Sequence, residues 1–183
     1  IAIVGHTRGI GKAIADLYQK KNYSIVGMSS SNGYDLQFSQ VEIMEQIDDC
    51  RLIVINAYVG GGQMTLLKRI YGKYLFENKK VVVITSTSGT PIGADEELDN
   101  PEYMDYCKNK KILIGYIEEL QQELFNKPLS IYDVCPDVVD TEMTKGLWED
   151  LPKLTAGEVA EAVRYCFEST FNVNKIVIQK NAH

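Results

Sequence analysis

The sequence predicts an α/β fold, a doubly wound parallel sheet of about seven strands with helices on both faces. Short apolar runs alternate along the chain with segments whose apolar residues recur at helical spacing. Residues 52–55 read Leu-Ile-Val-Ile, a continuous run typical of a parallel strand buried on both faces. The apolar run at 1–4 leads through a glycine-rich loop into a helix, as the units of such sheets do. No repeat or linker divides residues 1–183, so we expect one domain.

Each expected strand is a short apolar run followed by a polar or loop-forming residue, and most expected helices have an apolar face. Two helices have start signals: Asn100 is followed by Pro101 at the first helical position, and Thr155 with Glu158 has capping-box spacing. We expect strands at 1–4, 24–28, 34–36, 51–56, 80–85, 130–135 and 175–179. We expect helices at 10–22, 40–47, 63–77, 100–126 and 155–170, with a long polar loop at 86–100.

Composition and charge exclude several classes of protein. The net charge of −6 argues against a nucleic-acid surface, and no window of 18 apolar residues predicts a membrane span. No basic and apolar leader is visible. The cysteines at 50, 107, 135 and 166 form no Cys-x-x-Cys pair, and with two histidines they offer no metal-site spacing. We therefore expect no metal, and reduced thiols in a cytoplasmic protein.

The loop after the first strand carries glycines at 5, 9 and 11. Glycine accepts positive φ and lets the backbone approach a ligand closely, while the helix that follows presents unpaired N–H groups. A phosphate or diphosphate suits this arrangement. The alternative is a turn that only reverses the chain.

Other polar residues also follow predicted strands, where ligands bind in open parallel sheets. They include the serines at 29–31, Asn56, Ser86 and the segment 136–141. On the long helix, Tyr106 and Lys110 stand four residues apart and share a face. A nearby cation lowers the pKa of a tyrosine from its usual value of about 10, so we expect Tyr106 to titrate lower. The alternative is an ordinary surface pair.

Together these motifs resemble the short-chain dehydrogenase/reductase family. Gly5-x-x-x-Gly9-x-Gly11 is similar to its glycine pattern, and Tyr106-x-x-x-Lys110 to the pair that defines it. Further similar segments follow in order over nearly the whole chain: Ile55-Asn56-Ala57, Ile84 to Gly89, Val134 to Asp137 and Asp140 to Thr144.

The resemblance implies a Rossmann-type domain and an oxidoreductase that interconverts an alcohol and a carbonyl compound by hydride transfer. Tyr106 would exchange the hydroxyl proton, Lys110 would hold the ribose, and Ser86 would bind the carbonyl oxygen. The implied cofactor-binding residues are Gly5, Thr7, Arg8, Gly9, Ile10, Gly11, Ser29, Ser30, Asp35, Leu36, Asn56, Ala57, Tyr106, Lys110, Pro136, Val139 and Thr141. The alternative is a non-catalytic dinucleotide-binding sensor or regulatory protein of the same fold, which has no need of Ser86, Tyr106 and Lys110 together.

The chain departs from the family in several places. It is short, and between Asn56 and Lys80 no asparagine matches the relay asparagine of the family. Tyr58 stands where a glycine would follow Asn-Ala, and Asp137 replaces the glycine of Pro-Gly. Six apolar residues are candidates for the lining of a substrate pocket, and the alternative is that they belong to the ordinary packing of the fold. They are Tyr58, Met64, Tyr103, Met143, Leu147 and Trp148.

The cofactor expected is NADP(H), with NAD(H) less favoured. No carboxylate stands among the serines at 29–31 to accept from ribose hydroxyls, whereas Arg8 suits a 2′-phosphate. We also expect a homodimer or homotetramer formed through the long helix, because Ile112 and Tyr116 begin a second apolar side. The other expected partner is a small carbonyl or alcohol.

Overall fold

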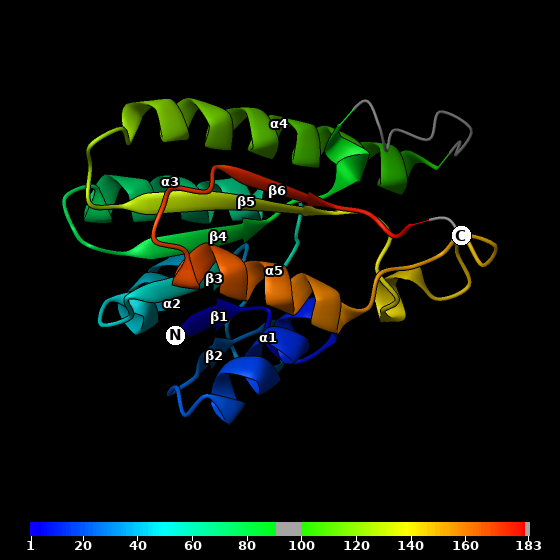
Figure 1. Cartoon of the computed structure of the whole chain (residues 1–183), viewed down its shortest axis with the longest axis horizontal. Coiled ribbons are helices and arrows are strands. Elements are labelled where there is room, and N and C mark those ends of the chain that lie inside the picture. Colours follow the sequence, from blue (N-terminus) through cyan, green and yellow to red (C-terminus); the bar gives the residue numbers. More distant parts are fainter. Residues whose placement is uncertain (91–99, 182–183) are drawn as a thin grey trace.

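The computed structural model describes residues 1–90 and 100–181, which form a six-stranded parallel sheet with helices on both faces (Figure 1). The strand order is β2-β1-β3-β4-β5-β6, so the chain reverses its direction of travel across the sheet between β2 and β3. The strands are β1 (Ala2–Val4), β2 (Val26–Met28), β3 (Leu52–Ile55), β4 (Lys80–Ile84), β5 (Ser130–Pro136) and β6 (Lys175–Ile178). The helices are α1 (Gly9–Lys20), α2 (Gln40–Ile47), α3 (Gly62–Tyr74), α4 (Pro101–Glu123) and α5 (Ala156–Glu168).

The expected strand at 34–36 is absent, so the described chain has six strands instead of about seven. The Asp35 Oδ1 atom accepts hydrogen bonds from the backbone N–H groups of Gln37, at 2.7 Å, and Phe38, at 3.2 Å. These bonds turn the chain towards α2, as aspartate side chains commonly do. Leu36 is buried close to Gly62 at the start of α3. The apolar residue read as part of a strand is therefore a core residue in a turn.

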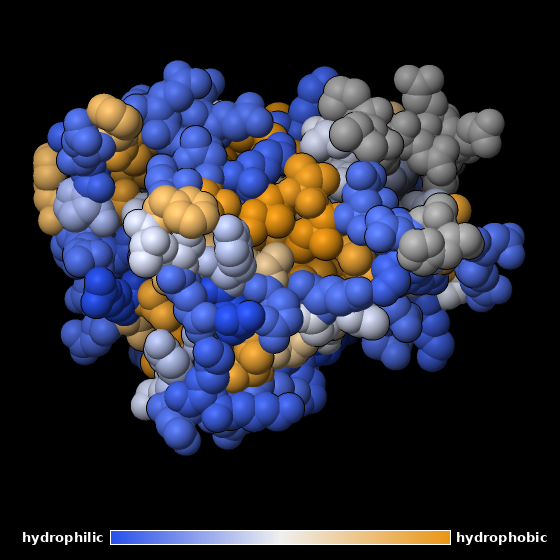
Figure 2. All heavy atoms as spheres, in the orientation of Figure 1, coloured by the Kyte–Doolittle hydropathy of each residue, from blue (hydrophilic) through white to orange (hydrophobic). Residues whose placement is uncertain are grey.

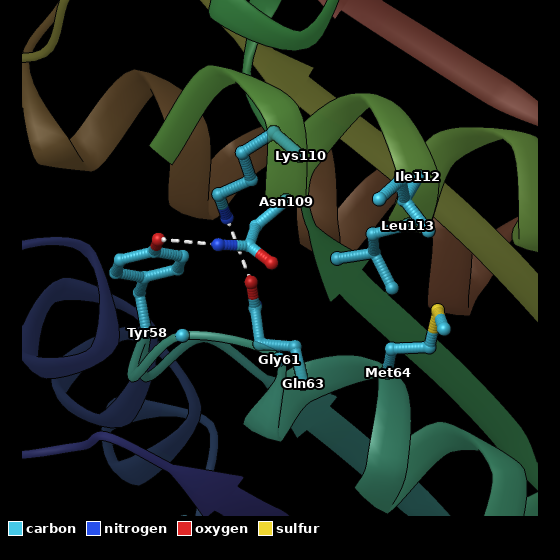
Figure 3. Close-up of a pocket in the computed structure, with 9 residues that line it drawn as sticks. Tyr58, Gly61, Gln63, Met64, Asn109, Lys110, Ile112 and Leu113 are labelled. Atoms are coloured by element: carbon cyan, nitrogen blue, oxygen red, sulfur yellow. Dashed lines mark hydrogen bonds between the residues drawn. The ribbon is translucent and has the colours of Figure 1, made fainter. Parts of the chain in front are cut away.

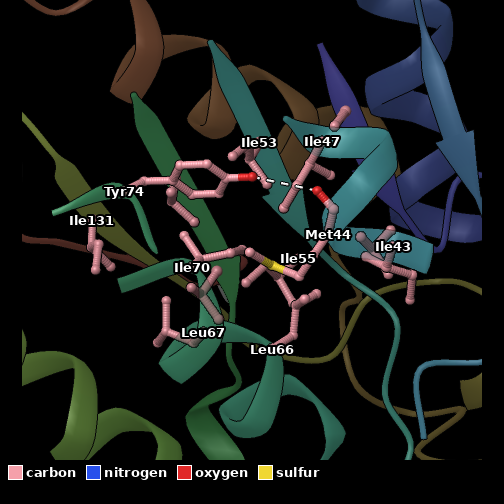
Figure 4. Packing of buried hydrophobic residues seen from close by; sticks show 14 of the residues in the cluster. Ile43, Met44, Ile47, Ile53, Ile55, Leu66, Leu67, Ile70, Tyr74 and Ile131 are labelled. Atoms are coloured by element: carbon pink, nitrogen blue, oxygen red, sulfur yellow. Dashed lines mark hydrogen bonds between the residues drawn. The ribbon is translucent and has the colours of Figure 1, made fainter. Parts of the chain in front are cut away.

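Two apolar cores lie on opposite faces of the sheet. One packs α2, α3 and α4 against β1, β3 and β4, and the other packs α1 and α5 against the reverse face. In the first core Tyr74 is fully buried, and its hydroxyl donates to the Met44 carbonyl oxygen at 3.4 Å (Figure 4). The same hydroxyl lies 2.9 Å from the Asp48 carboxylate. Because the central strands are covered on both faces, side chains on either face of a strand must be apolar. Their sequences are therefore continuous apolar runs and do not alternate between apolar and polar residues.

The long helix α4 begins as the sequence predicts. The Asn100 side chain accepts from the N–H groups of Glu102 and Tyr103, and Pro101 takes the first helical position. Its expected second apolar side is narrower than predicted: Ile112 is 48% exposed, whereas Tyr116 packs against the core with the Lys68 Nζ atom 5.3 Å from its ring centre. Assembly through this helix stays a prediction.

Strand β6 is, together with β2, one of the two edge strands of the sheet. Figure 2 shows an apolar patch in the middle of the face where this strand lies between α4 and α5. Val177 is exposed there, and Ile176 and Ile178 are partly buried against the second core. In the part of the chain that the structure describes, no helix is long and apolar enough to cross a membrane.

The carboxyl ends of the strands all point to one edge of the sheet, because every pair is parallel. The glycine loop follows β1, Asn56 follows β3 and Ser86 follows β4. The polar loop expected at 86–100 begins with a short 3-10 helix at Thr87–Gly89, and its residues 91–99 lie outside the described residues. Most of the predicted site residues therefore meet at this edge.

Candidate active site

The backbone of the glycine loop packs so tightly against neighbouring atoms that Gly5 and Gly11 leave no room for a side chain. Gly5 and Gly9 have φ values of 90° and 52°, which favour glycine. A Cβ on Gly11 would lie 1.8 Å from the carbonyl oxygen of Gly5 and 2.8 Å from the Asn56 Nδ2 atom. Arg8 stands at the N-cap of α1 and makes no side-chain capping bond. The first N–H groups of α1 are thus available to an anion, which fits a dinucleotide diphosphate.

We expect Gly11→Ala to destabilise the fold by about 3 kcal/mol and to weaken dinucleotide binding, because the loop must move to admit the methyl group. Gly72→Ala is the matched control. Gly72 lies in α3 with open space around its Cβ position, so that change should stabilise by about 0.5–1 kcal/mol. Urea unfolding of both variants and a titration with NADPH measure the effects. Equal stability of the two variants would contradict the role of Gly11.

Residues from two other segments pack against the loop. The Asn56 Nδ2 atom donates to the carbonyl oxygen of Gly5 at 2.9 Å, and the Ala57 N–H donates to Val4. On the other side, a Cβ on Gly9 would lie 3.2 Å from the Thr141 side chain. The predicted residues of the glycine loop, the β3 exit and the segment after β5 therefore come together. From that last segment, Pro136 ends β5 and Val139 is buried beside Leu154.

The segment after β2 is folded on itself. Ser29 is buried and its N–H donates to the Asn32 Oδ1 atom at 2.7 Å, while Ser30 is exposed. Residues 29–31 are all serines, so this segment offers no carboxylate to a ribose hydroxyl. Asp35 and Leu36 are engaged in the turn and the core described above, so a contact of either with adenine stays a prediction.

Ser86 and Tyr106 lie side by side at the β4 exit. The Ser86 Oγ atom caps the 3-10 helix by accepting the Ser88 N–H at 3.2 Å, and a Ser86–Tyr106 hydrogen bond acts to lower the pKa of Tyr106. Ser88 bonds instead to the Tyr103 hydroxyl, at 3.2 Å. The structure therefore pairs Ser86, and not Ser88, with Tyr106.

The expectation of a lowered pKa for Tyr106 is wrong for the chain without cofactor. Burial raises the pKa of Tyr106 to about 12, and this effect exceeds the opposing hydrogen bond from Ser86. The centre of the Tyr58 ring lies 4.8 Å from that of the Tyr106 ring in an edge-on contact, and the Tyr103 ring stacks with Tyr106 at 6.3 Å between ring centres. These neighbours shield the phenol from water, so Tyr106 is protonated at neutral pH.

Lys110 is 3% exposed, and the Lys110 Nζ atom reaches the carboxyl end of β4. It donates to the Gln63 Oε1 atom at 2.8 Å (Figure 3) and to the Ile84 carbonyl oxygen at 2.9 Å. The Nζ atom also lies 5.4 Å from the Tyr58 ring centre and 5.5 Å from that of Tyr106. Burial lowers the pKa of Lys110 to about 7, against the attraction of the Asp133 carboxylate.

A cavity of about 90 Å³ opens beside Lys110 between α3 and α4 (Figure 3). The Asn109 Nδ2 atom donates to the Tyr58 hydroxyl at 3.3 Å across it. Of the predicted pocket residues, Tyr58 and Met64 line this cavity. Tyr103 and Trp148 do not line it and contact each other at 5.7 Å between ring centres, and Met143 and Leu147 are exposed. The lining residues are Tyr58, Gly60, Gly61, Gln63, Met64, Asn109, Lys110, Ile112 and Leu113.

Sequence reasoning missed Gln63 and Asp133. Gln63 stands in the first turn of α3, shortly after a buried strand, where a polar residue is a weak signal. Asp133 lies within β5 and is 1% exposed; the Thr85 Oγ1 atom donates to its Oδ1 atom, and the Lys175 Nζ atom lies 3.4 Å from its Oδ2 atom. A carboxylate inside an apolar run was the signal for it. Among the described residues, no cluster of His, Cys, Asp or Glu is placed to hold a metal.

Comparisons with known proteins agree on one fold. No family model matches the sequence. The chain is 22% identical over 202 residues to the 3-oxoacyl-[acyl-carrier-protein] reductase FabG of Vibrio harveyi, covering 86% of this chain and 80% of that protein.

Two solved structures are similar throughout. The 3-alpha-hydroxysteroid dehydrogenase from Pseudomonas sp. B-0831, solved with NADH, has a TM-score of 0.74 at 14% identity and covers 97% of this chain and 94% of that one. A short chain dehydrogenase from Burkholderia cenocepacia J2315, solved with NADP, has a TM-score of 0.71 at 16% identity, with 97% and 95% covered.

Proposed function

Because the chain belongs to the short-chain dehydrogenase/reductase family, we propose that it is an NADP-preferring oxidoreductase that interconverts an alcohol and a carbonyl compound. One observation carries the proposal: Ser86, which follows β4, lies beside Tyr106 and Lys110, which share a face of α4, at the edge of the sheet where the glycine loop also lies. A protein that only bound a dinucleotide would not need a buried lysine beside a phenol that is paired with a serine.

Each group of site residues has its own proposed role in the reaction. The N–H groups at the start of α1 would hold the diphosphate, and Lys110 the ribose. When bound, the nicotinamide dinucleotide supplies or accepts the hydride. The Ser86 hydroxyl would donate a hydrogen bond to the carbonyl oxygen of the substrate. The Tyr106 hydroxyl would give that oxygen its proton during reduction and take it back during oxidation.

The protonation state of Tyr106 is the one that carbonyl reduction requires. Because the pKa of Tyr106 is raised to about 12, its hydroxyl carries the proton that a carbonyl oxygen needs. For oxidation the same group must first lose that proton. The test is NADPH consumption with a panel of aldehydes and ketones. Failure of every carbonyl in the panel, with tight NADPH binding retained, would favour the sensor instead.

The cofactor preference is tested at Arg8. We expect Arg8→Ala to weaken NADPH binding about tenfold or more and to leave NADH binding nearly unchanged, since a charged hydrogen bond contributes about 1.5–3 kcal/mol. Lys12→Ala is the control, because Lys12 lies one turn further along α1 and pairs with Asp16 at 2.8 Å. Calorimetric titration measures all four affinities. An equal loss of NADPH and NADH affinity in Arg8→Ala would refute recognition of the 2′-phosphate.

A further inference from the structure

Gln63 is buried, at 2% exposure, and its side-chain amide is fully engaged. The Gln63 Nε2 atom donates to two backbone carbonyl oxygens at the carboxyl ends of neighbouring strands, Ile55 at 3.2 Å and Ile84 at 3.1 Å. Both amide hydrogens are therefore used, and only the carbonyl end of the amide is left to face Lys110. The orientation of this acceptor is set by the backbone of β3 and β4.

The Lys110 ammonium completes a ring of hydrogen bonds. It donates to the Gln63 Oε1 atom at 2.8 Å and to the same Ile84 carbonyl oxygen that accepts from Gln63, at 2.9 Å. Within residues 1–90 and 100–181, Lys110 forms no ion pair. A buried ammonium without hydrogen-bond acceptors is strongly unfavourable, so Gln63 supplies an interaction that this position requires.

We propose that Gln63 is the positioning residue of this site, and that it holds the Lys110 ammonium between the rings of Tyr58 and Tyr106. This inference rests on the proposed function, since Lys110 acts there through Tyr106 and the ribose. If the acceptor is lost, the lysine stem can turn away from the ring centres, which lie 5.4 Å and 5.5 Å from its Nζ atom.

The proposal also determines how the proton on Lys110 responds to substitution. A neutral amide stabilises the ammonium by hydrogen bonding alone, whereas a carboxylate at the same position adds opposite charge. The other groups that act on Lys110 are the Asp133 carboxylate and the Cys135 thiol of β5, together with the two tyrosine rings. These stay in place when Gln63 alone is changed.

The experiment compares Gln63→Leu with Gln63→Glu, two changes of similar size. We expect the pKa of Lys110 to fall in the Leu variant and to rise by about one unit or more in the Glu variant. NMR titration of labelled lysine side chains measures both shifts in the protein without cofactor, with the Lys110 signal assigned by its absence in Lys110→Met. Gln40→Leu is the control, because Gln40 is another buried glutamine whose amide donates to the Leu36 and Gly62 carbonyl oxygens.

Kinetics supply a second measurement. The alkaline limb of the kcat profile should move to lower pH in the Leu variant and to higher pH in the Glu variant, with KM for the carbonyl nearly constant. Shifts of the Lys110 pKa in the same direction, or no shift beyond that of Gln40→Leu, would overturn the proposal. If the Leu variant does not fold, a Glu variant without a raised pKa overturns it equally. The NMR result does not depend on turnover, so failure of the proposed function alone leaves it standing.

Discussion

Replacement of Tyr106 by phenylalanine should lower kcat by about a hundredfold or more, the scale of a lost general acid. Only the hydroxyl is removed, so the ring contacts with Tyr58 at 4.8 Å and with Tyr103 at 6.3 Å remain. Burial favours the neutral phenol, and a phenyl ring is neutral at every pH. Stability and NADPH affinity should therefore be nearly unchanged. Steady-state kinetics, thermal unfolding and a cofactor titration measure the three quantities.

Tyr71→Phe is the matched control for this variant. The Tyr71 hydroxyl also bonds towards α4, at 2.6 Å from a Glu123 carboxylate oxygen, but at the far end of that helix. It should retain full turnover. Ser86→Ala should slow the chemical step less than Tyr106→Phe does, because Ser86 orients the carbonyl oxygen without transferring its proton. Full activity in Tyr106→Phe would remove the acid–base assignment and leave the dinucleotide sensor as the better hypothesis.

Replacement of Lys110 by methionine should separate catalysis from stability. Turnover should fall by about a hundredfold or more, and NADPH should bind more weakly, since both roles proposed for the ammonium are lost. The loss leaves the Gln63 and Ile84 oxygens without this donor, which costs about 1–3 kcal/mol. Removal of a buried amine offsets much of that. At neutral pH the variant should thus stay folded.

The pH dependence of unfolding gives the sharper measurement. The pKa of Lys110 is about 7 in the folded chain and 10.5 when unfolded, so between pH 7 and pH 9 the unfolded state binds the extra proton. This group therefore makes the unfolding free energy of the wild type rise with pH, by up to about 1.4 kcal/mol per unit. The methionine variant lacks this contribution. Parallel curves for the two proteins over this range would show that Lys110 is not a buried, weakly basic amine.

The fold and most of the site could be predicted from the sequence because both depend on local patterns. The apolar runs of β3 and β4, the glycines at 5, 9 and 11 and the spacing of Tyr106 and Lys110 are all readable within a few residues. Since parallel strands end at one edge, residues that follow different strands must approach each other there. That rule brings Asn56, which follows β3, to Gly5, which follows β1.

What could not be predicted depends on contacts between distant segments. Leu36 is apolar in a strand as in a turn, and only its packing against Gly62 decides between them. The pKa of Tyr106 is raised mainly by burial, which depends on how other segments pack around the phenol and which helix spacing does not reveal. Gln63 was missed for the same reason. Its role depends on hydrogen bonds to the ends of two strands and to Lys110, which are distant in the sequence.

The only tryptophan of the sequence, Trp148, stands with a φ of 50° and its ring 5.7 Å from Tyr103, next to the helix turn that carries Tyr106. Indole emission shifts with the polarity around the ring and is quenched by nearby acceptors. The chain therefore carries a single indole fluorophore, which can be excited apart from its tyrosines and lies in the segment after β5, beside the proposed site. Its emission spectrum reports on this one place without labelling and without a background from other indoles.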